Sequence, residues 1–120
     1  MASSKEYLQF ILEQLSDLEE IHYRAMMGEY LTGLFNAMGE YIIYYRGRIV
    51  GGIYDDRLLV KPTKSAVSYM ATAIYELPYE GAKEMLLVED ADSKEYLAGL
   101  FKAMYDELPV HKSNNKIMKF

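Results

Sequence analysis

Apolar positions near the start of the chain recur with the period of an α-helix. From residue 7 to residue 18 they fall mostly three or four apart, so they share one side of a helix. These positions are Tyr7, Leu8, Ile11, Leu12, Leu15 and Leu18. Ser3 or Ser4 is placed to cap this helix, and Ser3 with Glu6 has the spacing of a capping box. We therefore predict an N-terminal amphipathic helix with one buried side.

The middle of the chain has the pattern of β-strands. Runs of β-branched and aromatic residues alternate with short polar breaks, which predicts an antiparallel β-meander. The predicted strands cover residues 42–45, 48–54 and 57–61, with a further extended segment over 21–27. Turns are expected at Arg46-Gly47 and Asp55-Asp56. Pro62 ends the meander, because proline has no N–H to donate to a continuing strand.

The last third returns to helical patterns. A short helix is expected over 64–73, whereas 76–79 and 84–88 fit either irregular or extended structure. A final helix is expected to begin at an Asp92 cap with Glu95 as its capping partner and to stop before Pro109. Its apolar stripe consists of Leu97, Leu100, Phe101, Met104 and Leu108. The pattern as a whole predicts an α+β fold, in which the meander packs against the N-terminal and C-terminal amphipathic helices.

An internal repeat interrupts this organisation. Met-Gly-Glu-Tyr occurs at 27–30 and again at 38–41, and the stretch 31–38 closely matches 97–104 in the final helix. We interpret 31–41 as an eleven-residue insert that forms a short amphipathic helix. Its expected interface consists of Leu31, Leu34, Phe35 and Met38. So short a helix needs packing partners, either in its own domain or in a second copy, which makes a homodimer one expected outcome.

Composition narrows the class of protein. The 120 residues fit one domain, expected over 1–109, followed by a flexible basic tail over 110–120. The absence of cysteine excludes disulfides and thiolate chemistry. No apolar run is long enough to cross a membrane and no leader pattern is evident, so we expect a cytoplasmic protein without a membrane partner.

The net charge is −5, and the charged residues are unevenly distributed along the chain. Residues 42–64 hold five bases against two acids and the last thirteen residues hold three lysines, whereas the remainder is acidic. Bases and aromatic rings in the meander predict an interaction surface. This surface comprises Tyr44, Arg46, Arg48, Tyr54, Arg57, Lys61 and Lys64. Basic groups neutralise phosphates and rings stack on bases, so direct nucleic-acid binding is an alternative, although the acidic total makes nucleic acid the less favoured partner.

Few residues suggest catalysis or cofactor binding. His22 and His111 have no neighbours at catalytic or metal-ligand spacing, and we interpret Gly51-Gly52 as close backbone packing or a bulge. Asp55-Asp56 suits a turn, and the acids of 89–92 suit a helix N-terminus. We therefore expect no catalytic residue, metal or cofactor, with a metal-dependent enzyme using Asp55, Asp56 or Glu89 as a remote alternative.

Removing one repeat copy joins Tyr23-Arg24-Ala25-Met26-Met27-Gly28-Glu29-Tyr30 to the strand, turn and Asp55-Asp56-Arg57-Leu58 pattern of 42–61. This string resembles the N-terminal domain of the TfoX/Sxy family, and the likeness extends over about 3–109 apart from the insert. The resemblance implies an α+β domain linked to natural competence, where family members act with a transcription activator. We expect no counterpart within these 120 residues of the helical second domain of the longer regulators. We accordingly expect a non-enzymatic regulatory module that acts through protein contacts.

Overall fold

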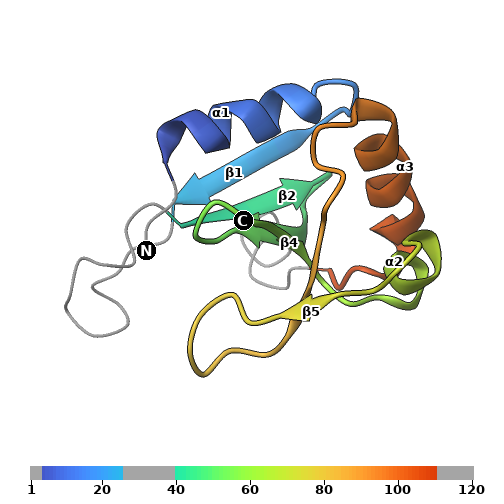
Figure 1. The fold of residues 1–120 in the computed structure, drawn as a ribbon. Helices are drawn as coiled ribbons and strands as arrows, with labels where there is room; N and C mark the ends of the chain where they lie inside the picture. The colour runs from blue at the N-terminus through green and yellow to red at the C-terminus, as the bar shows by residue number, and fades with distance from the viewer. Residues whose placement is uncertain (1–3, 26–39, 111–120) are drawn as a thin grey trace, which may run out of the picture.

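The computed structural model describes residues 4–25 and 40–110 and is built around a six-stranded antiparallel sheet (Figure 1). The order across the sheet is β1-β2-β3-β4-β6-β5. The strands are β1 (Ile21–Ala25), β2 (Tyr41–Tyr45), β3 (Arg48–Ile53), β4 (Leu58–Val60), β5 (Tyr75–Glu76) and β6 (Met85–Leu87). The helices are α1 (Lys5–Gln14), α2 (Lys64–Tyr69), α3 (Lys94–Met104) and the 3-10 helix η2 (Tyr105–Glu107). The predicted α+β fold is confirmed.

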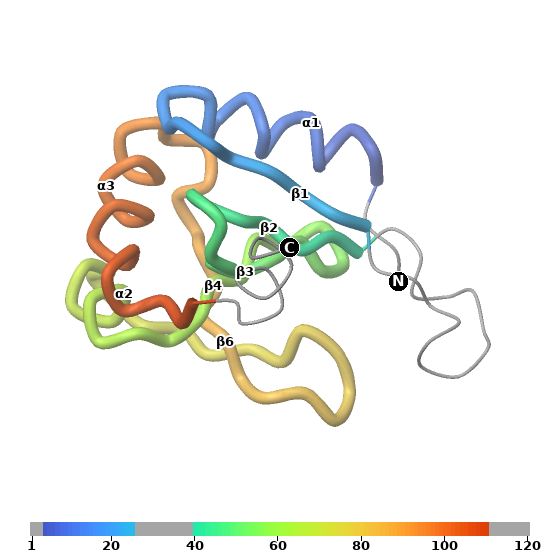
Figure 2. The backbone as a smooth tube through the Cα atoms, turned by 180° about the vertical axis from the view of Figure 1, so that it is seen from behind, coloured from blue at the N-terminus to red at the C-terminus, as the bar shows by residue number. Residues whose placement is uncertain are grey.

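The first and last helices supply the stripes that close the hydrophobic core. Leu8 and Ile11 of α1 and the following Leu15 are buried, as are all five predicted stripe residues from Leu97 to Leu108. They join one face of the sheet, to which β2 contributes every second side chain, Tyr41, Ile43 and Tyr45. Figures 1 and 2 show α1 running alongside β1, and α3 packed next to α2.

Both predicted turns are confirmed as two-residue hairpin connections. Arg46 and Gly47 have φ of 52° and 85°, and Asp55 and Asp56 both have φ of 55°. Positive φ at both central residues matches the right-handed twist of the flanking strands, which explains the use of Gly and Asp. The second turn also anchors α1, because the Ser4 N–H donates to Asp56 Oδ1 (2.9 Å).

Gly51 and Gly52 lie at a tight point of the sheet, as predicted. The register shifts so that Ile43 faces Gly51 while Tyr44 faces Ile49, which leaves Val50 as the extra residue of a bulge. A Cβ on Gly51 would lie 2.7 Å from the Val60 Cα of the neighbouring strand. A Cβ on Gly52 would meet the Tyr54 ring, so this ring covers the glycine.

Several boundaries differ from the sequence prediction. Ser93, not Asp92, caps α3, because its Oγ accepts the Tyr96 N–H at the third helical position (3.1 Å). This helix passes into η2 after Met104, before Pro109 is reached. The helix expected over 64–73 ends at Tyr69, because Met70 adopts an extended backbone. The third meander strand is shorter than 57–61, because Arg57 pairs with Tyr54 to close the turn.

The sheet is larger than the predicted meander. The two segments left open between irregular and extended structure contain β5 and β6. β6 pairs with β4, and β5 then forms the edge opposite β1. Strands from both halves of the chain thus form one sheet, and the first and last helices share its hydrophobic core. Among the described residues, no helix is long and apolar enough to cross a membrane.

Candidate interaction surface

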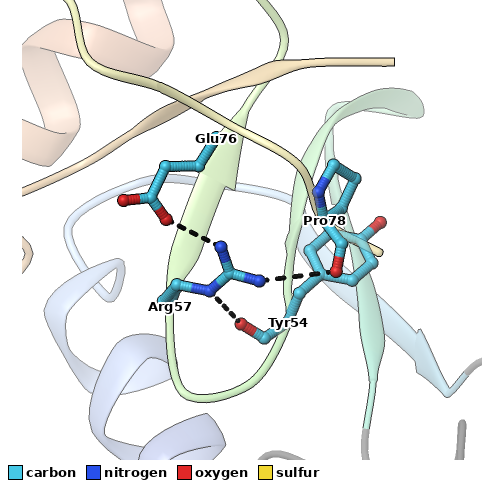
Figure 3. Close-up of polar contacts among 4 residues, drawn as sticks. All are labelled: Tyr54, Arg57, Glu76 and Pro78. Atoms are coloured by element: carbon cyan, nitrogen blue, oxygen red, sulfur yellow. Dashed lines mark hydrogen bonds and ion pairs between the residues drawn. The ribbon is translucent and has the colours of Figure 1, made fainter. Parts of the chain in front are cut away.

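Arg57 connects the turn between β3 and β4 to the segment that follows β5. Its Nε donates to the Tyr54 carbonyl (3.0 Å), its Nη1 to Glu76 Oε1 (2.7 Å) and its Nη2 to the Pro78 carbonyl (3.4 Å), as Figure 3 shows. We call this set of contacts the Arg57 clasp. The ion pair with Glu76 is partly shielded, since the two side chains are 27% and 34% exposed. The clasp holds Leu77 between two tethered neighbours.

Three large apolar side chains on and beside β5 face solvent. Tyr75 and Leu77 are each 47% exposed and Tyr79 is 40% exposed. We call these three residues the β5 surface. Such side chains usually contribute to a core, and a group of them near a sheet edge is a feature of protein-binding sites. The Tyr79 ring rests on the Tyr54 ring, with centroids 6.0 Å apart, so this surface is supported from below.

A shallow hollow of about 250 Å³ adjoins the β5 surface. Its lining includes the apolar residues Pro62, Pro78 and Met85, together with two cationic residues and one acidic residue, Lys61, Lys83 and Glu84. The hollow therefore offers apolar contact beside charged groups that have one more cation than anion.

Burial perturbs two ionisable groups near the clasp. It raises the pKa of the Tyr54 hydroxyl to about 12, with smaller contributions from Tyr79 and Glu40. Glu40 is only 9% exposed, and burial likewise raises the pKa of its carboxyl. Both groups thus favour their neutral forms more than they would in water.

The basic residues predicted as one surface lie in separate places. Arg46 lies in the turn before β3 and Arg48 begins that strand, and their guanidinium carbons lie 4.8 and 4.3 Å from the Tyr105 ring centroid. Arg48 Nη1 also donates to the carbonyls of Tyr105 (3.0 Å) and Leu108 (3.3 Å). Arg57 lies beyond the other end of β3, engaged in the clasp.

The remaining members of that predicted surface are also dispersed. Tyr54 is buried, and Lys61 is half-buried beside the hollow. Lys64 is exposed at the start of α2, and Tyr44 lies half-buried on β2. The structure therefore brings Tyr54, Arg57 and Lys61 together near the β5 surface but leaves the other four residues elsewhere. The predicted insert interface of Leu31, Leu34, Phe35 and Met38 lies outside the described residues.

The residues considered for catalysis occupy turns and exposed edges. Asp55 and Asp56 form the hairpin turn, Glu89 lies in the exposed turn before Ser93, and His22 is exposed on β1. Within residues 4–25 and 40–110, no cluster of three or more His, Cys, Asp or Glu side chains is arranged to hold a metal ion.

Sequence reasoning did not single out the β5 surface. A weak signal was present, because Tyr75, Leu77 and Tyr79 alternate with Glu76 and Pro78 in the manner of a strand. Alternation alone does not tell which side faces solvent. Their exposure depends on which side chains the rest of the fold leaves uncovered, and only the structure shows this.

Comparison with known proteins adds a relative but no function. A protein of Spirochaeta aurantia, described as an uncharacterized 12.7 kDa protein in the trpE 5′ region, is 27% identical over 90 residues. These residues cover 75% of this chain and 69% of that protein. No protein-family model matches the chain. No solved structure matches it significantly.

Proposed function

We propose that the chain is a non-enzymatic protein-interaction module, similar to the N-terminal domain of TfoX/Sxy regulators, that recruits a protein partner such as a transcription activator. The observation that carries this proposal is the β5 surface, in which three exposed apolar side chains are held beside the Arg57 clasp. The sequence resemblance supports a regulatory role, and the surface supports contact with a protein.

The geometry favours binding at the β5 surface for two physical reasons. Tyrosines contribute large contact areas and are frequent among the residues that dominate interface energies. The clasp holds the Glu76 side chain and the Pro78 carbonyl, which restrains the segment before binding and lowers the conformational entropy lost when a partner binds. A partner segment with apolar side chains would match the prolines of the hollow, and an acidic group on it would pair with Lys61 or Lys83, one of which Glu84 leaves in excess.

Direct nucleic-acid binding through the predicted basic surface has less support. Arg48 donates to two backbone carbonyls and Arg57 donates to three oxygens, so part of their donor capacity is already used. Their positions near opposite ends of β3 also divide the positive charge. A phosphate backbone is recognised best by cations that follow a continuous path.

The proposal is tested by affinity capture from native cytoplasm with the tagged chain. We expect wild-type protein to retain a specific partner that a Tyr75→Ser/Leu77→Ser variant loses. Val67→Ser is the matched control, because Val67 is an exposed apolar residue on α2. Capture of the same proteins by all three versions, or of none by wild type, would contradict the proposal.

A salt titration separates the nucleic-acid alternative. If that alternative holds, the affinity for a short DNA duplex should fall steeply with salt, and the Arg46→Ala/Lys64→Ala variant should show a smaller slope.

A further inference from the structure

His22, Arg24 and Tyr44 project from one small area of the sheet. His22 is the register partner of Tyr44, and Arg24 lies two residues further along β1. Because successive side chains of a strand point to opposite faces, all three share one face. The Arg46 N–H donates to the Glu20 carbonyl (2.9 Å), and such pairs alternate along an antiparallel ladder. His22 and Tyr44 therefore form a hydrogen-bonded pair, with Cα atoms about 5.5 Å apart.

This face lies opposite the hydrophobic core. The core takes Tyr41, Ile43 and Tyr45 from β2, and Tyr44 lies between two of these residues in sequence. His22 and Arg24 are exposed, whereas Tyr44 is half-buried and thereby held close to the sheet. The exposed His22 imidazole and Arg24 guanidinium thus lie on the same face as the half-buried Tyr44 ring.

A hollow of about 360 Å³ lies at this place, lined by His22, Tyr23, Arg24, Tyr44 and Gly47. Its volume falls within the range of about 300–1,000 Å³ that is usual for small-ligand sites. The described lining includes a guanidinium and an imidazole but no carboxylate. It therefore favours a ligand that carries negative charge next to a flat ring.

We propose that this hollow binds a nucleotide. The Arg24 guanidinium matches the geometry of a phosphate, the His22 imidazole donates a further hydrogen bond, and the Tyr44 ring supports the base. A free mononucleotide and a nucleotide within a single strand offer this same chemistry. The site lies on the sheet edge opposite the β5 surface, so it neither requires nor excludes the protein partner proposed above.

The test is an NMR titration of the full chain with adenosine 5′-monophosphate. We expect saturable shifts at residues 22, 24 and 44. Arg24→Gln and Tyr44→Leu should each weaken binding about tenfold, because they remove the charge pair and the stacking surface respectively. Tyr44→Phe keeps a ring, and Lys64→Gln removes an exposed cation from a distant helix, so both should retain wild-type affinity. Arg24 is exposed, so its variant remains informative if Tyr44→Leu fails to fold.

Further probes identify the source of the nucleotide. Tighter binding of a single-stranded tetra-adenylate, with the same dependence on Arg24, would assign the site to a strand. Equal or weaker binding of the tetra-adenylate would assign it to the free mononucleotide. Adenosine binding as tightly as the monophosphate, equal losses in Lys64→Gln and Arg24→Gln, or no binding at millimolar concentration would each overturn the proposal.

Discussion

Gly51 and Gly99 differ in the kind of atom that an added methyl group would meet. At Gly51 it would meet the backbone of Leu59 and Val60, which cannot move without disturbing the ladder between β3 and β4. At Gly99 it would meet the hydroxyl end of Tyr69, an exposed side chain that is able to turn away. We expect Gly51→Ala to lower the free energy of unfolding by about 3 kcal/mol, because overpacking has such a cost.

Gly99→Ala serves as the matched control. Alanine is favoured over glycine inside a helix by up to about 1 kcal/mol, which offsets the displacement of Tyr69. The net change should therefore stay within about 1 kcal/mol of wild type. Urea unfolding of both variants measures the difference, and equal losses would show that the distinction between backbone and side-chain neighbours is wrong.

The Tyr54 hydroxyl makes the free energy of unfolding depend on pH in the alkaline range. An unfolded tyrosine ionises near pH 10, whereas burial raises the pKa of Tyr54 to about 12. Between these values the unfolded chain releases more protons, so the free energy of unfolding falls as pH rises. A shift of this size corresponds to a loss of about 2–3 kcal/mol.

Tyr54→Phe keeps the ring over Gly52 and removes the proton. We expect this variant to lose less stability than wild type in urea unfolding at pH 11.5 relative to pH 9. Equal losses in the two proteins would assign the pH dependence to other groups, such as Tyr7 and Tyr96, whose pKa values burial also raises.

At the scale of elements, Arg48 fastens the end of the last helix to the sheet. It donates to the Tyr105 and Leu108 carbonyls and stacks on the Tyr105 ring, whereas the neighbouring Arg46 is exposed and contacts only the ring among the described side chains. We expect Arg48→Ala to cost about 2 kcal/mol, since hydrogen bonds from charged donors contribute that much. Arg46→Ala should cost about 0.5 kcal/mol, as exposed cation–π contacts do. Thermal unfolding measures both, and equal costs would contradict the structural role of Arg48.

Local sequence was a good guide to most elements. The helical stripes and both turns followed from periodicity and from the backbone preferences of Gly and Asp, which act over a few residues. Helix α3 began one residue later than expected, because Asp92 and Ser93 are both suitable cap residues and only the folded backbone shows that Ser93 accepts the Tyr96 N–H. The strands β5 and β6 stayed undecided, because each is only two or three residues long and depends on its partners.

At the scale of the whole molecule, the last helix completes a core that begins with the first. Leu97, Leu100, Phe101 and Met104 are fully buried. Each such side chain contributes about 1.5–3 kcal/mol, so together they equal the net stability of a typical domain. We expect a chain that ends after Asp92 to be unfolded at 25 °C. Circular dichroism with urea titration measures this, and a cooperative transition in the shortened chain would contradict it.

The candidate sites were predictable only in part. Arg57 and Lys61 were expected at an interaction surface and lie beside the hollow near β5, but Arg57 turned out to be a fastening between two segments. Arg46 and Arg48 were grouped with Arg57 by sequence, although the length of β3 separates them from it. Tyr75, Leu77 and Tyr79 were missed, because composition does not show which apolar residues remain exposed.

The sequence by itself determined the fold class, the two buried helix stripes and the two turns, because these depend on periodicity and backbone preference within short windows. Only the tertiary structure decided the strand order, the Arg57 clasp, the exposure of the β5 surface and the meeting of His22 and Arg24 with Tyr44. Each of these depends on which distant segments become neighbours. Burial of the whole core and pairing between strands determine which segments become neighbours. The sequence of a single segment does not carry this information.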